Sequence, residues 1–121
     1  MDDERSELPS TRARGQWGEA LAAEYLCRRG LELIDRNVTV AGAEIDLVAR
    51  AGDTIVFVEV RGRSDDRRGH PFETVDLRKQ ARIRRAATGW LVARGLWDQV
   101  AVRFDVIAVV GDELEWLPNA F

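Results

Sequence analysis

The sequence contains few of the residues on which disulfide-bonded, zinc-binding and membrane proteins depend. Its single cysteine, Cys27, excludes an internal disulfide and has no partner cysteines for a zinc site. We expect Cys27 to pack along a helix as a small apolar side chain. No apolar run is long enough to cross a bilayer, and there is no internal repeat or low-complexity tract. These absences leave the class of compact globular proteins.

Length and composition agree with one domain. Hydrophobic residues make up 45% and charged residues 32% of the 121 residues, a balance that one core of ordinary size accommodates. Residues 1–9 are polar and are predicted to form a disordered tail, and residues 10–121 a single domain. The acidic start, Met1 to Arg5, is not followed by an apolar run, so no secretory signal is predicted and the cytoplasm is the expected compartment.

Basic residues are concentrated in one segment, although the formal net charge is −3. Between Arg67 and Arg94 they are opposed only by Glu73 and Asp76. Such a cluster is typical of a surface that binds nucleic-acid phosphates. A solvated helix face explains the same charges equally well.

Apolar periodicity and turn residues predict the elements. The first is a helix that begins at Ser10 or Thr11 and ends at Gly30, with Trp17, Leu21, Tyr25, Ala22 and Leu26 on adjoining stripes. A strand over 31–36 follows, and residues 37–43 either continue it or form a loop. The remaining elements are strands over 44–49 and 54–61, a loop over 64–71, a helix over 76–94, and strands over 100–110 and 113–117.

The strands over 44–49 and 54–61 are predicted to form a hairpin with Gly52-Asp53 as its turn. If Ala51 pairs with Thr54, alternation of side chains gives the hairpin one wholly apolar face for the core and a second face that carries the chemistry. The predicted apolar pairs are Ala49 with Val56, Leu47 with Val58, and Ile45 with Val60. The predicted pairs on the other face are Val48 with Phe57, Asp46 with Glu59, and Glu44 with Arg61.

Asp46 and Glu59 are the candidate metal ligands. Like charges on paired strands destabilise a sheet, and a bound cation removes that cost. Magnesium takes hard oxygen ligands and commonly uses one or two carboxylates, and the backbone carbonyl of Val60 is close enough to join them. Arg61 would then stabilise negative charge on a phosphodiester that the metal polarises. The alternative is a surface salt bridge among Asp46, Glu59 and Arg61.

Asp46 followed by Glu59-Val60-Arg61 resembles the split aspartate and E-x-K signature of the restriction-endonuclease-like, or PD-(D/E)xK, nuclease superfamily. More closely, the chain resembles the YraN family of small bacterial proteins, which are similar to Holliday junction resolvases. The segments that carry this resemblance are 15–19, 36–37, 42–47, 56–61, 79–80, 103–106 and 119–121. They span nearly the whole chain.

The resemblance implies an α/β fold of the restriction-endonuclease type, with a mixed sheet whose central hairpin is flanked by helices. It implies a metal-dependent endonuclease that uses Mg²⁺ or Mn²⁺, and nucleic acid, most readily DNA, as the partner. It also implies a role at the metal for Glu19 and roles for Lys79 and Gln80. The predicted catalytic residues are therefore Glu19, Asp46, Glu59 and Arg61, and the predicted nucleic-acid-binding residues are Arg78, Lys79, Gln80, Arg82 and Arg85.

The sequence departs from the family pattern at two positions. Ala43 replaces the usual glycine before the G-E-I-D-L glutamate, which requires a small adjustment of the backbone. Arg61 replaces the usual lysine; it keeps the positive charge but does not give up a proton near neutrality, so it is not a general base.

Two further residues are given structural roles, since Asp105 is expected to pair with an arginine and His70 to be solvated in its loop.

These observations predict phosphodiester hydrolysis in DNA or RNA, including branched DNA. An enzyme that cleaves junctions would need two active sites, which favours a symmetric homodimer. Two other functions account for the same residues: a non-catalytic nucleic-acid-binding module, or a protein-interaction adaptor whose carboxylates only form salt bridges.

Overall fold

A computed structural model describes residues 11–63 and 75–121, and it describes the side chains of 17–62 and 75–121. The predicted tail at 1–9, the candidate cap Ser10, and the predicted 64–71 loop with Arg67, Arg68 and His70 lie outside the described residues. The described elements, in chain order, are α2 (Thr11–Arg28), β1 (Glu32–Val40), β2 (Ala43–Ala51), β3 (Thr54–Arg63), α3 (Leu77–Ala93), β4 (Ala101–Val110) and β5 (Glu113–Leu117).

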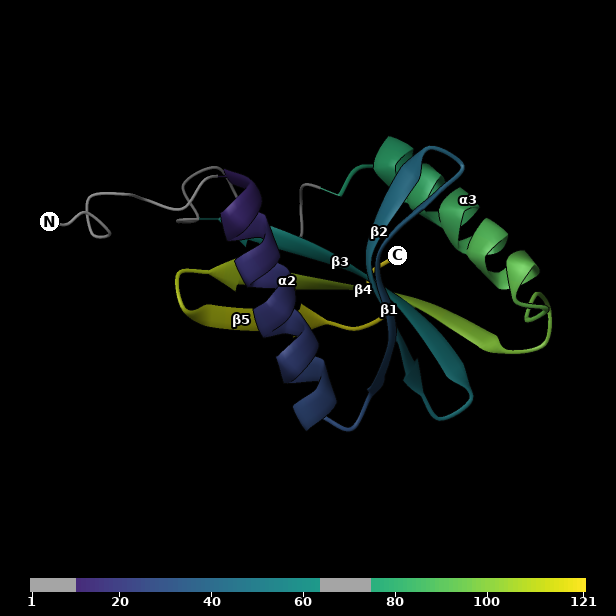
Figure 1. Cartoon of the computed structure of the whole chain (residues 1–121), viewed down its shortest axis with the longest axis horizontal. Coiled ribbons are helices and arrows are strands. Elements are labelled where there is room, and N and C mark those ends of the chain that lie inside the picture. Colours follow the sequence, from purple (N-terminus) through teal and green to yellow (C-terminus); the bar gives the residue numbers. More distant parts are fainter. Residues whose placement is uncertain (1–10, 64–74) are drawn as a thin grey trace, which may run out of the picture.

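The strands form one sheet in the order β1-β2-β3-β4-β5, in which only the β3–β4 pair is parallel. Helix α3 connects these two parallel strands, as a crossover connection must. Figure 1 shows α2 on one face of the sheet and α3 on the other. The described residues therefore form a single α/β domain, which confirms the predicted fold class.

The hairpin of β2 and β3 has the predicted register from its turn to Leu47. The pairs run from Ala51 with Thr54 to Leu47 with Val58. Alternation of apolar residues is sufficient to fix this register, because a slip of one residue would move every side chain to the other face.

Both faces of the hairpin are buried: the predicted apolar face forms one core, and Val48 and Phe57, on the face predicted to carry the chemistry, belong to a second core. The α2-side core includes Ala22, Leu26, Leu47, Ala49, Val56, Val58 and Ile107. The α3-side core includes Ile45, Val48, Phe57, Ile83, Ala87 and Trp90. Phe57 meets Trp90 edge to face with ring centroids 5.6 Å apart, a favourable arrangement for aromatic rings. A strand with helices on both faces is buried on both sides, as in α/β proteins generally.

The alternation of β2 is interrupted at Asp46. Leu47 belongs to the α2-side core, whereas Ile45, two residues earlier, belongs to the α3-side core. In a regular strand these two side chains would share a face. The predicted place of Ile45 beside Leu47 was therefore wrong, and the end of β2 before Asp46 is turned toward α3.

The neighbouring strand β1 is irregular at the same level. Its pairing gives Arg36 with Leu47 and Val38 with Ile45, and Asn37, between them, has a φ of 54°. Asparagine tolerates this left-handed conformation better than most residues. The tip of the β1–β2 hairpin therefore bends as a unit, and Val38 and Val40 reach the α3-side core.

Helix α3 has the predicted bounds because both of its ends are capped. The side chain of Asp76 accepts a hydrogen bond of 2.8 Å from the N–H of Lys79. At the other end Gly95 has a φ of 70°, and Leu96 N–H donates to Leu91 O, the pattern of a Schellman cap. Gly30 ends α2 in the same way, with a φ of 92°.

Two expectations for α2 were wrong. Trp17 was placed on an apolar stripe, but it is 65% exposed. Cys27 was expected to pack along the helix, but it is exposed as well. Over residues 17–28 the predicted stripe is otherwise confirmed: Ala22, Ala23 and Leu26 are buried, and Leu21 and Tyr25 are partly buried against the same core.

Asp105 is a structural anchor, as predicted. Its fully buried carboxylate accepts two hydrogen bonds of 2.9 Å from the guanidinium of Arg103. Trp116 Nε1 and the N–H of Asn119 also donate to it, at 2.9 and 2.8 Å. With its oxygens satisfied in this way, the charge is tolerated in the core and ties the segment after β5 to β4.

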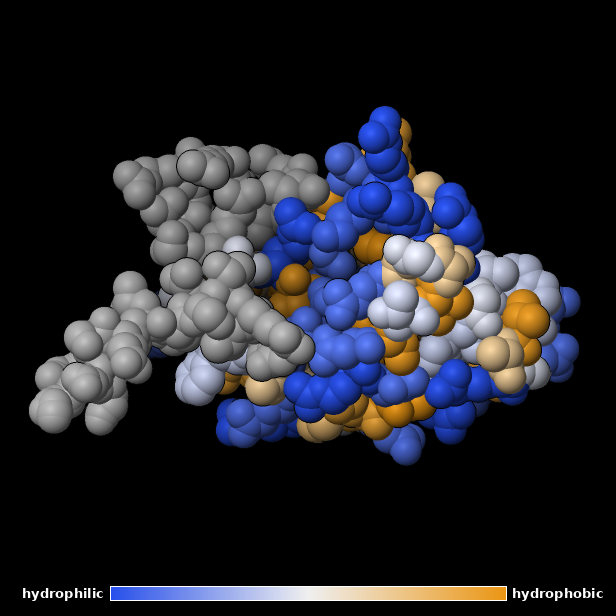
Figure 2. Space-filling view, turned by 45° about the horizontal axis from the view of Figure 1, so that its top comes forward, coloured by the Kyte–Doolittle hydropathy of each residue, from blue (hydrophilic) through white to orange (hydrophobic). Residues whose placement is uncertain are grey.

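The surface of the described residues carries no extended apolar face in the view of Figure 2. Hydrophilic side chains cover most of it, and hydrophobic ones are visible in separate places between them. Neither described helix has the length and apolar character that crossing a membrane requires.

The turn between β1 and β2 yields a first prediction. Ala41 has a φ of 53° and is followed by Gly42 at 79°, so the turn requires two residues in the left-handed region. We expect Ala41→Gly to raise the free energy of unfolding by about 0.5–1 kcal/mol, because glycine adopts this conformation without strain. Urea denaturation measures the change.

Ala43→Gly is the matched control. Ala43 lies in β2 without a positive φ, so the missing family glycine is not required by the backbone there. The same substitution at Ala43 should lower stability by about 0.5–1 kcal/mol. Equal destabilisation by both variants would contradict the assigned turn.

Candidate functional site

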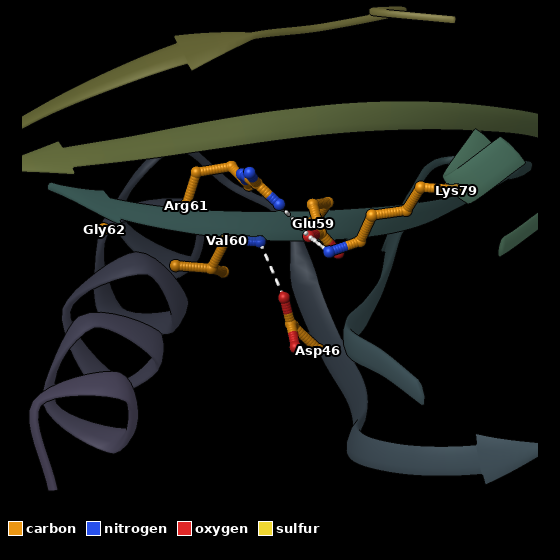
Figure 3. Close-up of a pocket in the computed structure, with 6 residues that line it drawn as sticks. All are labelled: Asp46, Glu59, Val60, Arg61, Gly62 and Lys79. Atoms are coloured by element: carbon orange, nitrogen blue, oxygen red, sulfur yellow. Dashed lines mark hydrogen bonds and ion pairs between the residues drawn. The ribbon is translucent and has the colours of Figure 1, made fainter. Parts of the chain in front are cut away.

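The candidate site is a cleft at the point where β2 separates from β3. The ladder between these strands ends at Leu47 with Val58, whereas β3 stays paired with β4 as far as Arg63 with Val110. One edge of β3 is therefore open beyond Val58. The cleft has a volume of about 410 Å³ and is lined by Asp46, Glu59, Val60, Arg61, Gly62 and Lys79 (Figure 3).

Asp46 takes over the role of the missing strand partner. Its Oδ2 accepts a hydrogen bond of 2.8 Å from the N–H of Val60. An unpaired backbone N–H is costly when buried, so this contact stabilises the separated strands. The predicted direct pairing of Asp46 with Glu59 is not part of the β2–β3 ladder, yet both carboxylates line the same cleft.

Glu59 is buried and pairs with two cations. Its Oε2 lies 3.2 Å from Arg61 Nη1 and 2.7 Å from Lys79 Nζ. Figure 3 shows the two basic side chains reaching this carboxylate from opposite sides. Arg61 comes from the same strand and Lys79 from the first turn of α3, so the contact with Lys79 joins the helix to the sheet.

The pKa of the Asp46 carboxyl is raised from its ordinary value to about 8. Burial is the largest cause, followed by the negative charge of Glu59, with Glu19 and Glu44 acting in the same direction. The hydrogen bond from Val60 opposes the shift because it stabilises the ionised form. Burial and the surrounding carboxylates outweigh this hydrogen bond, so the Asp46 carboxyl does not ionise easily at neutral pH.

Glu19 lies on α2 near Asp46, as its effect on the Asp46 pKa shows. Its Oε1 is buried and has no hydrogen-bond partner among the described residues. Such an orphaned buried oxygen requires a physical explanation. The preceding residue, Gly18, faces the sheet, where an added Cβ would lie 3.9 Å from Val60 Cγ1. The start of α2 is thus packed beside the cleft.

The ligand set of the cleft is small. Within residues 11–63 and 75–121, no group of three or more His, Cys, Asp or Glu side chains is arranged to hold a metal ion. Glu19 therefore does not join Asp46 and Glu59 as a ready third ligand. The Val60 carbonyl points to the same edge of β3 as its N–H, because both groups of a residue in an extended strand face one side.

The predicted nucleic-acid-binding residues lie in three different environments. Arg78, Arg82 and Arg85 are exposed on α3. Gln80 is half-buried, and its Nε2 donates to the carbonyl of Val75 at 3.0 Å, so its side chain supports the start of the helix. Lys79, predicted as part of this surface, lies in the cleft with Glu59 instead.

The position of Lys79 is the feature of the site that the sequence pattern did not give. Lys79 is 20 residues beyond Glu59, and nothing in the helical periodicity places it beside β3. One signal was present: Lys79 is the only lysine among 18 lysine and arginine residues. An ammonium and a guanidinium are not equivalent, and a single lysine in an arginine-rich chain marks a position where the difference matters.

Comparison with known proteins shows relatives along nearly the whole chain. The uncharacterised protein family UPF0102 matches residues 18–109. A UPF0102 protein of Serratia proteamaculans is 48% identical over 113 residues, which cover 93% of this chain and 97% of the relative. One of Chromohalobacter salexigens is 47% identical over 115 residues, with 92% of each chain covered. One of Yersinia pseudotuberculosis is 47% identical over 113 residues, with coverages of 93% and 97%. The matched range contains the whole cleft.

The raised pKa of Asp46 yields a second prediction, for protein free of divalent cations. A carboxyl whose pKa is higher folded than unfolded stabilises the fold fully below its unfolded pKa of about 3.9. That contribution is lost as the pH rises through the folded pKa of about 8. Asp46→Asn keeps an acceptor for Val60 but does not ionise. We expect it to match the wild type near pH 4 and to exceed its free energy of unfolding by about 1 kcal/mol or more above pH 8.

Urea denaturation at both pH values measures this difference. Asp53→Asn, in the exposed turn between β2 and β3, removes a carboxylate without removing a group of the cleft. It should show no comparable gain above pH 8. A constant difference between Asp46→Asn and the wild type across this range would contradict the electrostatic account.

Proposed function

This chain belongs to the uncharacterised protein family UPF0102, the YraN family, and we propose from its cleft that it is a metal-dependent endonuclease that hydrolyses phosphodiesters in DNA. The observation that carries the proposal is the pair of carboxylates, Asp46 and Glu59, at the point where two central strands separate. The separation exposes backbone and side-chain oxygens at the edge of β3 while both faces of the sheet remain buried.

The residues of the cleft fit a magnesium or manganese ion. Asp46 is partly buried near other carboxylates and ionises with difficulty, and among the described residues Glu19 Oε1 has no hydrogen-bond partner, so a cation beside these two oxygens would be stabilised. Asp46, Glu59 and the Val60 carbonyl would hold the ion, and waters would complete its shell, as is usual for magnesium. When bound, the ion supplies polarisation of the phosphodiester and activation of a water.

The chain's own cations would act on the substrate. Arg61 is placed beside Glu59, where its guanidinium can stabilise negative charge that develops on the phosphate. Arg78, Arg82 and Arg85 project from α3, which starts at the cleft, and would hold the backbone of the nucleic acid on either side of the scissile bond. Cleavage of a branched DNA would need a second copy of this site, and a symmetric homodimer would supply it.

A non-catalytic nucleic-acid-binding module is the second candidate, and one observation favours it. Glu59 is paired with two cations of the chain itself, Lys79 and Arg61. A cleft whose carboxylate is neutralised in this way can contribute to the fold and still present the arginines of α3. Metal binding and turnover distinguish the two candidates.

The third prediction concerns turnover. We expect the wild type to cleave at least one of a set of branched, flapped and single-stranded DNAs with Mg²⁺ or Mn²⁺. Asp46→Ala should abolish cleavage because it removes a metal ligand. Arg61→Ala should lower the rate roughly a hundredfold, the usual effect of deleting one donor to a transition state, while Arg61→Lys keeps the charge and most of the activity.

Gel assays under single-turnover conditions measure these rates. An inactive wild type that gains activity as Arg61→Lys would show that the position needs a lysine, and that the natural protein is a weak enzyme. Metal-saturated protein that is inactive on every substrate, both as wild type and as Arg61→Lys, would overturn the nuclease proposal and leave the binding module.

The fourth prediction concerns the arginines of α3. Each phosphate contact releases counterions, so the dependence of affinity on salt counts the contacts. Replacing Arg78, Arg82 and Arg85 by glutamine should weaken DNA binding and lower the slope of log K against log salt by roughly 2 to 3. Fluorescence anisotropy over a range of salt concentrations measures the slope.

A second triple variant controls for net charge. Arg28 and Arg29 follow one another at the end of α2, and Arg50 lies near the opposite end of β2 from Asp46; all three are exposed. Replacing them by glutamine changes the charge equally but away from the cleft. Equal slopes for the two triple variants would mean that α3 is only a solvated surface.

A further inference from the structure

Lys79 and Arg61 share one oxygen of Glu59. Lys79 Nζ lies 2.7 Å and Arg61 Nη1 3.2 Å from Oε2, and the side chain of Glu59 is only 7% exposed. Charge-assisted contacts of this length in a buried place are strong. The carboxylate that would hold a metal is thus paired with two cations of the chain.

Arg61 and Lys79 differ in how firmly the chain holds them near Glu59. Arg61 is two residues from Glu59 on the same strand, so the backbone keeps its guanidinium close. Lys79 comes from α3 through a flexible side chain that is 33% exposed, against 23% for Arg61. Of the two, Lys79 is the cation that can leave Glu59 and turn toward solvent.

The place of Lys79 at the start of α3 means that its ammonium needs another negative group when it leaves Glu59. The N-cap Asp76 accepts from the N–H of Lys79, but the first turn itself contains no acidic residue, and its other free N–H groups carry partial positive charge. The ammonium of Lys79 is therefore stabilised by a negative group at its own end of the side chain. Glu59 is that group at 2.7 Å, and the phosphate of a nucleic acid has the same charge and similar oxygens.

We propose that Lys79 is the cation that a divalent metal displaces from Glu59, so that metal binding releases the ammonium of Lys79 to bind a nucleic-acid phosphate at the cleft. The inference rests on the proposed metal-dependent function and deepens it by linking two binding events. A metal ion at Asp46 and Glu59 repels the ammonium. A phosphate bound at the cleft attracts it, so each ligand makes binding of the other more favourable.

Such linkage is reciprocal. If metal raises the affinity for nucleic acid by some factor, nucleic acid raises the affinity for metal by the same factor, and couplings of this kind are commonly about 5- to 150-fold. Lys79→Met removes the charge but keeps an unbranched side chain of similar length. It should ease metal binding and diminish the linkage.

The first measurement is a titration of the full chain with Mn²⁺ alone, followed by the electron paramagnetic resonance signal of free Mn²⁺. We expect Lys79→Met to bind Mn²⁺ about tenfold more tightly than the wild type, because no cation has to be displaced. Lys79→Arg should stay near the wild type. Arg78→Met, which removes the exposed neighbouring charge, should stay within about twofold, since the effect requires contact with Glu59.

Tighter Mn²⁺ binding also separates this role from a structural one. If Lys79 only docks α3 on the sheet, its loss should loosen the cleft and weaken metal binding together with a lower melting temperature. Affinity equal to or weaker than that of the wild type would overturn the inference. Absence of Mn²⁺ binding by all four proteins would instead overturn the proposed function on which it rests.

The second measurement is the linkage itself. Calcium takes the same kind of oxygen ligands, so the affinity for a labelled four-way DNA junction is measured by anisotropy with Ca²⁺ and with a chelator. We expect Ca²⁺ to raise the affinity of the wild type by a factor about ten times larger than for Lys79→Met. Direct attraction between metal and phosphate is common to both proteins and cancels in this ratio.

Arg78→Met is the control here as well and should lose affinity equally with and without Ca²⁺. Equal factors for the wild type and Lys79→Met, with metal binding intact in both, would overturn the linkage while leaving the nuclease proposal standing.

Discussion

The N–H of Val60 needs an acceptor at the point where its strand loses its neighbour, and the side chain of Asp46 provides it. The course of β2 and the shape of the cleft follow from this replacement of a main-chain acceptor by a side chain. Because a side chain replaces main-chain pairing, β2 can leave β3 and carry Ile45 onto the α3-side core while the N–H of Val60 stays hydrogen-bonded. The same bond buries a carboxylate beside Glu59. The hydrogen bond that satisfies the Val60 N–H thus also places two carboxylates close together in the cleft.

The two carboxylates at the point where β2 and β3 separate differ in the charges around them. Glu59 has Arg61 and Lys79, whereas the pKa of Asp46 is raised by its burial and by the carboxylates around it. A buried ion pair is weak support for stability because desolvation cancels most of its attraction. The same pair is well suited to exchange, since partners of similar charge can replace one another at little net cost. The arrangement favours binding chemistry over rigidity.

Much of this could be predicted from the sequence, and the limits have physical reasons. Alternating apolar residues fixed the register from Ala51 to Leu47, and capping residues fixed the ends of α3, because both signals are local. The change of face at Ile45 could not be predicted, since it depends on packing against α3, which begins only at Leu77. The contact of Lys79 with Glu59 was missed for the same reason. The buried pairing of Asp105 was predicted correctly because a charge in an apolar strand admits few solutions.

The crossover between β3 and β4 has a consequence for folding. Both carboxylates belong to the hairpin of β2 and β3, which can form through local contacts, whereas Lys79 arrives only with the helix that precedes the parallel strand. Pairings between distant segments are the slow part of folding because a loop must be closed before they form. The carboxylates and Arg61 therefore belong to one unit of local contacts, whereas the contact of Lys79 with Glu59 requires the non-local docking of α3 on the sheet.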